Sequence, residues 1–350
     1  MIDSIKDNSP SPSHPYDALT PDAVLNAVDS VVPSLSGLAS GCTDGRQLAL
    51  NSYENRVYQV GLEDNEPVIA KFYRPARWSD EAILEEHNFT EALAQIEIPV
   101  VAPLRDDANQ SLFEYGGFRF ALYARRGGRT PDLEDMDNLM WMGRFIARIH
   151  ALGVAKPFEF RPELNTDTFG WDSYRYLMST NFIPDDLKVA YSTLVEDVLK
   201  QVEMGFERAG ANEGKINNIR LHGDCHPGNI LWTDDGPHFV DFDDARMGPA
   251  VQDLWMLLSG ERKQMTQQLD EILSGYSEFM DFNSRELHLI EPLRCLRMIH
   301  YSAWLARRWD DPTFPMHFPW FAEQRYWEEQ ILSLREQLAI MDEPPLQWMG

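Results

Sequence analysis

The sequence predicts an α+β fold with two lobes, a β-rich N-terminal lobe and a mostly helical C-terminal lobe. Short alternating apolar runs fill residues 46–124, which is typical of antiparallel strands. After the pair Gly127–Gly128 the apolar residues recur at helical spacing almost to the end of the chain. We therefore expect a flexible lead at 1–19, an N-terminal lobe at 20–124 and a C-terminal lobe at 125–350.

The composition indicates a protein with a substantial core and a strongly acidic surface. Of the 350 residues 43% are hydrophobic, and the formal net charge at pH 7 is −25. Nucleic acid and anionic membrane surfaces would repel such a chain, so we expect neither as a partner. The start of the chain is polar and the most apolar helical stretches contain arginine, which favours a cytoplasmic protein without a membrane span. No heptad pattern is visible, and we expect a monomer.

The most informative stretch of the sequence is 222–241, HGDCHPGNILWTDDGPHFVD. The step from Asp224 to Asn229 has the D-x-x-x-x-N spacing of the protein-kinase catalytic loop, whose Asp is the base and whose Asn holds a metal. The apolar runs ILW and HFV around the turn TDDGP predict a hairpin, which would return Asp241 to the side of Asn229. Asp241 would then bridge Mg2+ to the phosphates of ATP. The same residue types build ordinary turns, but the ordered combination indicates phosphoryl transfer to a hydroxyl group.

Two further parts of such a site lie upstream. Lys71 ends the run VIAK, which resembles the V-A-I-K strand whose lysine holds the α and β phosphates. The helix expected in WSDEAILEEHNFTEALAQI offers Glu85 and Glu86 as carboxylates that could position this lysine. We favour Glu86 because it shares a face with Phe89, and we expect the other glutamate to be solvated.

The loop that would cover the phosphates lacks the glycines of protein kinases. Between the first two predicted strands the sequence reads NSYENR, so small polar groups and backbone amides would meet the phosphates. Ser52 is our candidate nucleotide contact. The alternative is that residues 51–55 form an ordinary polar hairpin turn. The strand that ends at Tyr123 and Ala124 is where backbone groups would meet the adenine.

Two features follow the catalytic stretch. Asp253 opens the predicted helix QDLWMLL and resembles the kinase aspartate that supports the catalytic loop by hydrogen bonds, which is the role we expect for it. It could equally be a simple N-cap, and the two roles are compatible. Further on, a segment rich in aromatic residues contains four arginines, Arg294, Arg297, Arg307 and Arg308. This basic cluster would receive an acidic or phosphorylated acceptor, or else form internal ion pairs with the many carboxylates.

The motifs HGDCHPGN, VDFDDA and QDLWMLL resemble the family of aminoglycoside phosphotransferase-like and choline-kinase-like enzymes, which share the protein-kinase fold. More narrowly, LNSYENRVYQV, AKFYRP, ILEEH and DPTFPMHFPW are similar to the bacterial stress response kinase A group. The resemblance covers most of the chain and implies an ATP-dependent serine/threonine protein kinase of the stress response, with magnesium as cofactor. It also implies that Asp224 is the base, that Asn229 and Asp241 bind the metal, and that Ser52 and Lys71 contact ATP.

The acceptor stays open at this stage. The form HGD-x-H-x-x-N occurs mostly in kinases of small alcohols and amino sugars, so a choline, amino sugar or homoserine-like alcohol is the alternative to a protein Ser or Thr. A third interpretation is a catalytically silent module that binds ATP. Such a module would show neither hydrolysis nor autophosphorylation.

Overall fold

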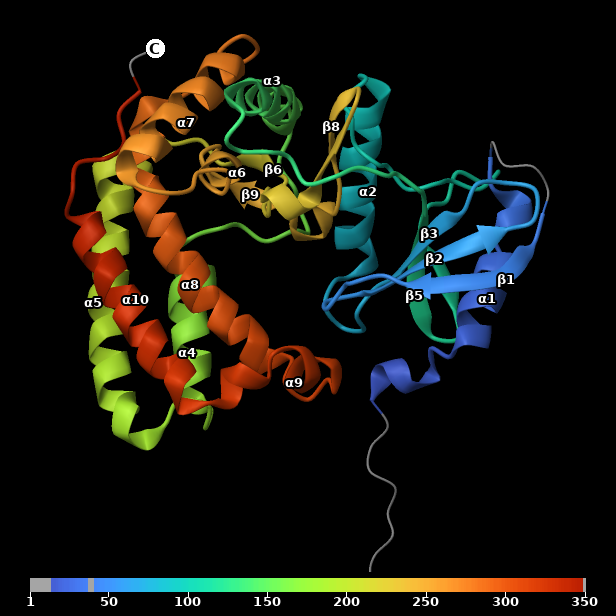
Figure 1. Cartoon of the computed structure of the whole chain (residues 1–350), viewed down its shortest axis with the longest axis horizontal. Coiled ribbons are helices and arrows are strands. Elements are labelled where there is room, and N and C mark those ends of the chain that lie inside the picture. The colour runs from blue at the N-terminus through green and yellow to red at the C-terminus, as the bar shows by residue number, and fades with distance from the viewer. Residues whose placement is uncertain (1–13, 37–40, 349–350) are drawn as a thin grey trace, which may run out of the picture. The chain divides into compact units, whose positions relative to one another are not determined.

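The computed structural model describes residues 14–36 and 41–348, which cluster into two compact units. The β unit takes the chain before Ser79 together with Pro103–Arg125, and the helical unit takes Ser79–Ala102 together with the chain from Arg126 onward. The predicted α+β fold class is confirmed, because strands dominate the first unit and helices the second (Figure 1).

An antiparallel sheet of five strands, in the order β1-β2-β3-β5-β4, forms the centre of the β unit. The strands are β1 (Thr43–Ala49), β2 (Arg56–Leu62), β3 (Val68–Phe72), β4 (Phe113–Tyr115) and β5 (Phe118–Ala124). In the middle of this sheet Val57 of β2 and Ala121 of β5 lie opposite Lys71 of β3. The lysine therefore stands in the central strand of the sheet.

The first described elements of the chain pack on this unit. They are η1 (Pro15–Ala18), α1 (Pro21–Asp29) and η2 (Val32–Ser34). Helix α1 begins as predicted, because Pro21 is its first residue and the hydroxyl of Thr20 accepts the backbone N–H of Ala23 at 3.2 Å. Tyr16 and Leu19 are buried in the core of the β unit, so this part of the predicted lead is packed. Residues 1–13 of that lead lie outside the described residues.

The helical unit contains most of the helices and two small two-stranded sheets. Its helices are α2 (Asp80–Gln95), α3 (Met136–Gly153), α4 (Asp172–Ser179), α5 (Asp185–Ala209), α6 (Gln252–Trp255), α7 (Arg262–Tyr276), α8 (Ile290–Arg307), α9 (Thr313–His317) and α10 (Gln324–Met341). Short helical turns are η3 (Thr166–Trp171), η4 (Ala211–Glu213), η5 (Pro227–Asn229), η6 (Phe242–Asp244), η7 (Ser284–Leu289) and η8 (Pro319–Ala322). The paired strands are β6 (Ile219–Leu221) with β9 (Arg246–Gly248), and β7 (Ile230–Thr233) with β8 (Gly236–Phe239).

Helices α3 and α7 cross at two glycines. A Cβ on Gly143 would lie 2.1 Å from the carbonyl oxygen of Ile272, and one on Gly275 would lie 2.1 Å from that of Met140. Each helix therefore presents a glycine to the backbone of the other, and a larger side chain would force the two axes apart.

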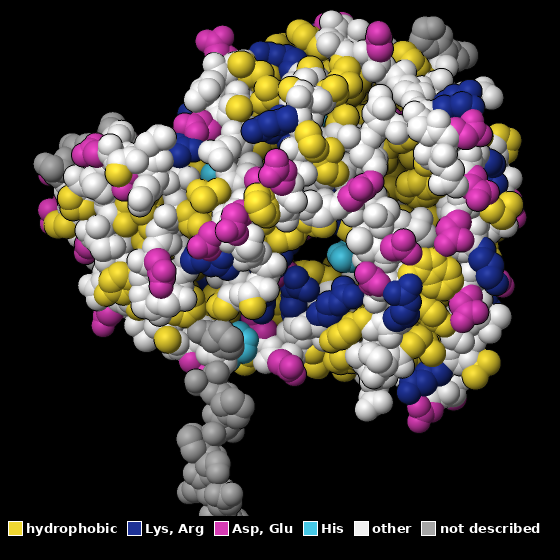
Figure 2. Space-filling view, turned by 180° about the vertical axis from the view of Figure 1, so that it is seen from behind, with side chains coloured by type: hydrophobic (Ala, Val, Ile, Leu, Met, Phe, Trp, Pro, Cys, Tyr) yellow, Lys and Arg dark blue, Asp and Glu magenta, His cyan; other side chains and the backbone are white. Residues whose placement is uncertain are grey.

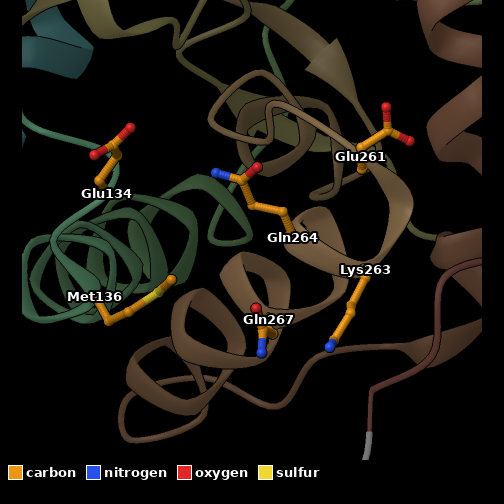
Figure 3. A pocket seen from close by; sticks show the side chains of 6 residues that line it. All are labelled: Glu134, Met136, Glu261, Lys263, Gln264 and Gln267. Atoms are coloured by element: carbon orange, nitrogen blue, oxygen red, sulfur yellow. The ribbon is translucent and has the colours of Figure 1, made fainter.

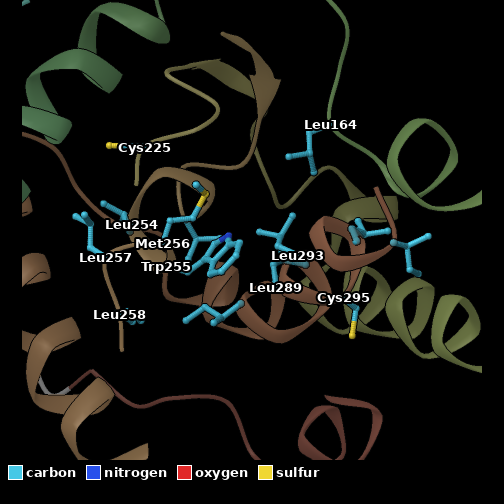
Figure 4. Close-up of a cluster of buried hydrophobic side chains, with 14 of the residues drawn as sticks. Leu164, Cys225, Leu254, Trp255, Met256, Leu257, Leu258, Leu289, Leu293 and Cys295 are labelled. Atoms are coloured by element: carbon cyan, nitrogen blue, oxygen red, sulfur yellow. The ribbon is translucent and has the colours of Figure 1, made fainter. Parts of the chain in front are cut away.

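A layer of apolar side chains lies under the catalytic stretch (Figure 4). Leu254 in α6, Leu257 just after it, Leu289 just before α8 and Leu293 in the first turn of α8 are all buried in the main core of the helical unit. Cys225, next to Asp224 in the sequence, belongs to the same core. The loop that carries Asp224 is thus anchored in a packed apolar core.

Among the described residues no helix has the length and apolar character that crossing a membrane requires.

Candidate active site

The loop between β6 and β7 carries the predicted base and is folded on itself by local hydrogen bonds. The ring of His226 accepts the backbone N–H of Gly228 through Nδ1 at 3.0 Å, which caps the turn η5. The amide nitrogen of Asn229 donates to the backbone carbonyl of Asp224 at 3.0 Å. The two ends of the D-x-x-x-x-N motif are therefore joined directly.

The predicted hairpin after Asn229 is confirmed. Strands β7 and β8 pair with Ile230 opposite Phe239, and the backbone N–H of Val240 donates to the carbonyl of Asn229 at 3.0 Å. This bond brings the chain just before Asp241 back to Asn229, as the sequence predicts. Asp241 has a φ of 59°, in the left-handed region that non-glycine residues seldom adopt. Such strain is typical of functional positions.

Asp224 forms an ion pair that the sequence does not predict. Its Oδ1 accepts from Nη1 of Arg297 on α8 at 2.6 Å, and its Oδ2 lies 3.5 Å from Nε2 of His226. Burial would raise the pKa of the Asp224 carboxyl, but the hydrogen bond from His226 and the charge of Arg297 outweigh it and hold that pKa well below its usual range. The carboxylate is therefore ionised at neutral pH, which is the state that a general base requires.

Asp253 supports the catalytic loop from α6. Its Oδ2 accepts the backbone N–H of His222 at 2.8 Å, and its Oδ1 accepts that of Gly223 at 2.9 Å. Nε2 of His150 lies 3.1 Å from the same carboxylate. Of the two predicted roles of Asp253 the supporting one is confirmed, because the N-cap position of α6 belongs to Val251.

Gly223 is required by this arrangement. Its φ is 86°, and a Cβ there would lie 2.2 Å from the carbonyl oxygen of Asp244. The residue before the base is thus clamped between the carboxylate of Asp253 and the segment that follows Asp241.

A buried glutamate holds the start of α6 in turn. Oε2 of Glu286, in η7, accepts the backbone N–H of Val251 at 2.9 Å. Burial raises the pKa of Glu286 to about 7, although the hydrogen bonds that its carboxylate accepts from the backbone of Val251 and Ala250 lower the pKa. Glu286 therefore supports Asp253 indirectly, through the backbone of α6.

Glu86, on helix α2, is 2% exposed. Its Oε2 lies 3.5 Å from Nη2 of Arg161. The expectation that Glu85 is solvated is wrong, because its carboxylate accepts the backbone N–H groups of Glu159, Phe160 and Arg161 at 2.6 to 3.2 Å. A turn of three successive N–H groups that can bind a carboxylate is not visible in the sequence.

Arg161 connects α2 to the segment after Asp241. Its Nε donates to the carbonyl of Ala82 at 3.0 Å, and its Nη1 donates to the carbonyls of Asp243 and Ala245 at 2.9 and 2.8 Å. This role of Arg161 cannot be predicted from the sequence, since nothing in its neighbourhood distinguishes it from a surface arginine.

The remaining predicted residues lie in the β unit. Lys71 is 7% exposed, with Nζ 5.4 Å from the centre of the Tyr73 ring. Ser52 is half-buried in the loop between β1 and β2. Arg74 fixes that loop, since it donates to the carbonyls of Tyr53 and Glu54 and forms an ion pair with the Glu54 carboxylate at 3.1 Å. The loop is therefore anchored more firmly than an ordinary hairpin turn.

The residues predicted to bind the metal fit a magnesium ion that keeps water or phosphate oxygens as further ligands. The side-chain nitrogen of Asn229 is bonded to Asp224, so the atom that it can offer a cation is its oxygen. Asp241 adds a carboxylate, and Mg2+ is commonly held by one or two such groups together with substrate phosphates. Among the described residues no group of three or more His, Cys, Asp or Glu side chains is arranged to hold a metal.

A separate hollow lies between the beginnings of α3 and α7 (Figure 3). It has a volume of about 530 Å³ and is lined mainly by polar side chains, namely Glu134, Met136, Glu261, Lys263, Gln264 and Gln267. None of the predicted catalytic or metal-binding residues is among them, so we assign it no part in the reaction.

Known proteins are similar to this chain over most of its length. Residues 46–290 match the phosphotransferase enzyme family. The chain is 40% identical over 333 residues to the stress response kinase A of Escherichia coli (strain K12), which covers 95% of this chain and 96% of that protein. It is 43% identical over 298 residues to the serine/threonine protein kinase RdoA of Salmonella typhimurium (strain LT2), covering 85% of this chain and 88% of that one.

Solved structures show the same fold at low sequence identity. The amicoumacin kinase hAmiN, in complex with AMP-PNP and Ca2+, superposes with a TM-score of 0.64 at 17% identity, over 90% of this chain and 92% of that one. A microcompartment-associated aminopropanol kinase gives a TM-score of 0.63 at 15% identity, over 93% and 96% of the two chains. The kinase-like fold, the long match and the high identity to the curated relatives together show that the chain belongs to the phosphotransferase enzyme family.

Proposed function

We propose that this protein is an ATP-dependent serine/threonine protein kinase of the bacterial stress response, with Mg2+ as its metal. The observation that carries the proposal is the joined motif of Asp224 and Asn229, with Asp241 returned beside it by the β7–β8 hairpin. Few other reactions need an ionised carboxylate and two oxygen ligands for a cation in this order. Because ATP is the donor, we expect the kinase to act in the cytoplasm, and we expect a monomer.

Each residue has a defined task in this proposal. Asp224 orients the hydroxyl group of the acceptor and takes its proton as the new P–O bond forms. Asn229 and Asp241 would hold Mg2+, which when bound neutralises charge on the β and γ phosphates. Lys71 would bind the α and β phosphates and Ser52 the phosphate chain, while Glu86 would be the carboxylate that positions Lys71.

The protein acceptor rests on the relatives, one of which bears the name serine/threonine protein kinase and the other the name stress response kinase. A small alcohol is the second candidate. It is favoured by the HGD-x-H form of the loop and by structural neighbours whose names are those of small-molecule kinases.

The test is phosphoryl transfer by the purified protein from γ-labelled ATP in the presence of Mg2+. Protein acceptors and small alcohols are offered in parallel. We expect label on Ser or Thr, and we expect the Asp224→Asn variant to lose it by orders of magnitude while remaining folded.

The matched control is Asp234→Asn, in the exposed turn of the β7–β8 hairpin, which should keep the activity of the parent protein. Faster turnover of an alcohol than of any protein would favour the second candidate. Normal transfer by Asp224→Asn would overturn the mechanism.

A further inference from the structure

The ion pair between Arg297 and Asp224 puts a positive charge at the base itself. The side chain of Arg297 is 41% exposed, whereas that of Asp224 is 23% exposed. A guanidinium has five N–H donors, and within the described part of the chain Asp224 is the carboxylate that it binds. Arg297 therefore has donors left for a second anion without giving up the first.

The sequence around Arg297 is basic in an otherwise acidic protein. From Pro292 to Trp309 it contains four arginines and no Asp or Glu, while the whole chain carries a formal charge of −25. On the face of the molecule shown in Figure 2 acidic side chains are spread over the surface, with Lys and Arg among them. The run free of carboxylates in α8 thus departs from the general pattern of the surface.

Internal pairing accounts for part of this basic run. Arg294 pairs with Glu291 one turn earlier, with 3.3 Å between Nε and Oε2. Arg307 donates to a backbone carbonyl, that of Asp172, and its guanidinium lies 4.8 Å from the centre of the Tyr176 ring. Neither contact of Arg307 cancels its charge with a carboxylate side chain.

One face of α8 combines this charge with aromatic rings. Arg297, Tyr301, Trp304 and Arg308 follow one another at steps of four, three and four residues, which places them in one stripe of the helix. Tyr301 is 39% exposed and stacks on Trp304 with ring centres 5.7 Å apart, and Arg308 lies 5.4 Å from the centre of the Trp304 ring. We call these four residues the α8 stripe.

The length of the α8 stripe suits an extended peptide. The eleven steps along α8 from Arg297 to its C-cap, Arg308, span about 16 Å, which about five residues of extended chain would cover. Aromatic rings and arginines are the side chains that binding surfaces favour.

We propose that the α8 stripe binds the acceptor polypeptide and selects one with Asp or Glu near the Ser or Thr to be phosphorylated. Arg297 meets a carboxylate close to the hydroxyl, and Arg308 meets one about five residues away. Cationic acceptors are disfavoured, because an ammonium group beside Asp224 would face Arg297. This inference rests on the proposed function, since it requires a hydroxyl acceptor at Asp224.

The test is a library of Ser and Thr peptides in which the five positions on either side of the acceptor vary. The full-length protein is supplied with Mg2+ and ATP, and kcat/KM is compared for the best acidic peptide and its counterpart with Lys in place of Asp or Glu. We expect the acidic peptide to be favoured about tenfold, an effect of the size that two partly exposed charge contacts produce.

Variants separate recognition from a structural role. Arg297→Gln and Arg308→Gln should each reduce the ratio between the two peptides, mainly through KM, whereas Arg297→Lys should keep much of it. The control is Arg208→Gln, at the exposed end of α5, which should leave the ratio unchanged. A merely structural role of Arg297 would lower the rates for both peptides equally.

The outcomes distinguish the two proposals. Equal use of acidic and basic peptides, or a ratio that survives both glutamine variants, overturns the docking inference and leaves the kinase intact. Transfer to small alcohols and to no peptide contradicts the protein acceptor. An absence of transfer to every hydroxyl overturns the proposed function, and the docking inference with it.

Discussion

Asp253 and Gly223 are joined by a hydrogen bond of 2.9 Å from the backbone N–H of the glycine to Oδ1 of the carboxylate. The bond crosses 30 residues of sequence and fixes the backbone immediately before the proposed base. Because both groups are buried, neither can exchange its partner for water.

Removing the Asp253 carboxylate should impair both stability and rate. Asp253→Ala leaves two buried N–H groups without acceptors, which we expect to cost about 2 to 4 kcal/mol in the free energy of unfolding. The displaced loop should lower kcat by about 10- to 100-fold. Denaturant unfolding and steady-state kinetics measure the two effects. Asp253→Asn keeps the shape of the side chain and one oxygen acceptor, so its stability and its kcat should lie between those of the parent protein and the Ala variant. Unchanged kinetics in the Ala variant would contradict a supporting role.

The crossing of α3 and α7 predicts an effect opposite to that of helix propensity. Ala normally stabilises a helix by about 0.5 to 1 kcal/mol relative to Gly. At Gly275 the added Cβ meets the backbone of Met140, so Gly275→Ala should instead destabilise the protein by about 1 to 3 kcal/mol. Gly127→Ala is the control, because no atom lies within 4 Å of the added Cβ. Thermal unfolding compares the two, and a stabilised Gly275→Ala variant would show that the helices do not meet at this point.

Glu286 makes stability depend on pH. The burial of Glu286 raises its pKa in the folded protein to about 7, from an ordinary value of 4.5. Between these values the folded protein keeps a proton that the unfolded chain has lost, so stability falls as pH rises from about 4.5 to about 7. The full effect is on the order of 3 kcal/mol.

Glu286→Gln should remove this component, since the amide cannot ionise and its oxygen can still accept the N–H of Val251. The measurement is the free energy of unfolding of both proteins at pH 5 and pH 7.5. If the free energy of unfolding falls equally in the two proteins between pH 5 and pH 7.5, Glu286 is not the group that makes stability depend on pH.

Asn229 should set the magnesium requirement. Asn229→Ala removes one proposed ligand, so the Mg2+ concentration at half-maximal rate should rise by about 10- to 100-fold. Titration of the rate with Mg2+ at saturating ATP measures the change. Asn218→Ala, at an exposed position before β6, should titrate like the parent protein. An unchanged midpoint in Asn229→Ala would remove this residue from the metal site.

Local sequence patterns predict the helices and strands near the site, whereas the side chains that contact each other across long sequence separations depend on tertiary packing. The hairpin that returns Asp241 could be predicted because its turn and its paired strands are contiguous in the sequence. Arg297 could not be placed on Asp224, since 73 residues separate them and the packing of α8 determines the contact. The partners of the Asp253 carboxylate, the N–H groups of His222 and Gly223, lie about 30 residues earlier and likewise depend on tertiary packing.

In the β unit, too, the strands can be predicted from the sequence but the side-chain contacts cannot. The alternation of residues predicts the strands, and Lys71 stands in the central strand of the sheet. No pattern in the sequence indicates that Arg74 anchors the loop with Ser52. An arginine after a strand has many possible acceptors, and its choice depends on the path of the whole loop.

The buried guanidinium of Arg161 makes helix α2 and the segment after Asp241 mechanically dependent on each other. It binds the carbonyl of Ala82 on one side and those of Asp243 and Ala245 on the other. A displacement of α2, which carries Glu86, would therefore also displace the segment that follows Asp241, a proposed metal ligand. Arg161 is thus one side chain through which a movement of α2 would be transmitted toward the proposed metal site.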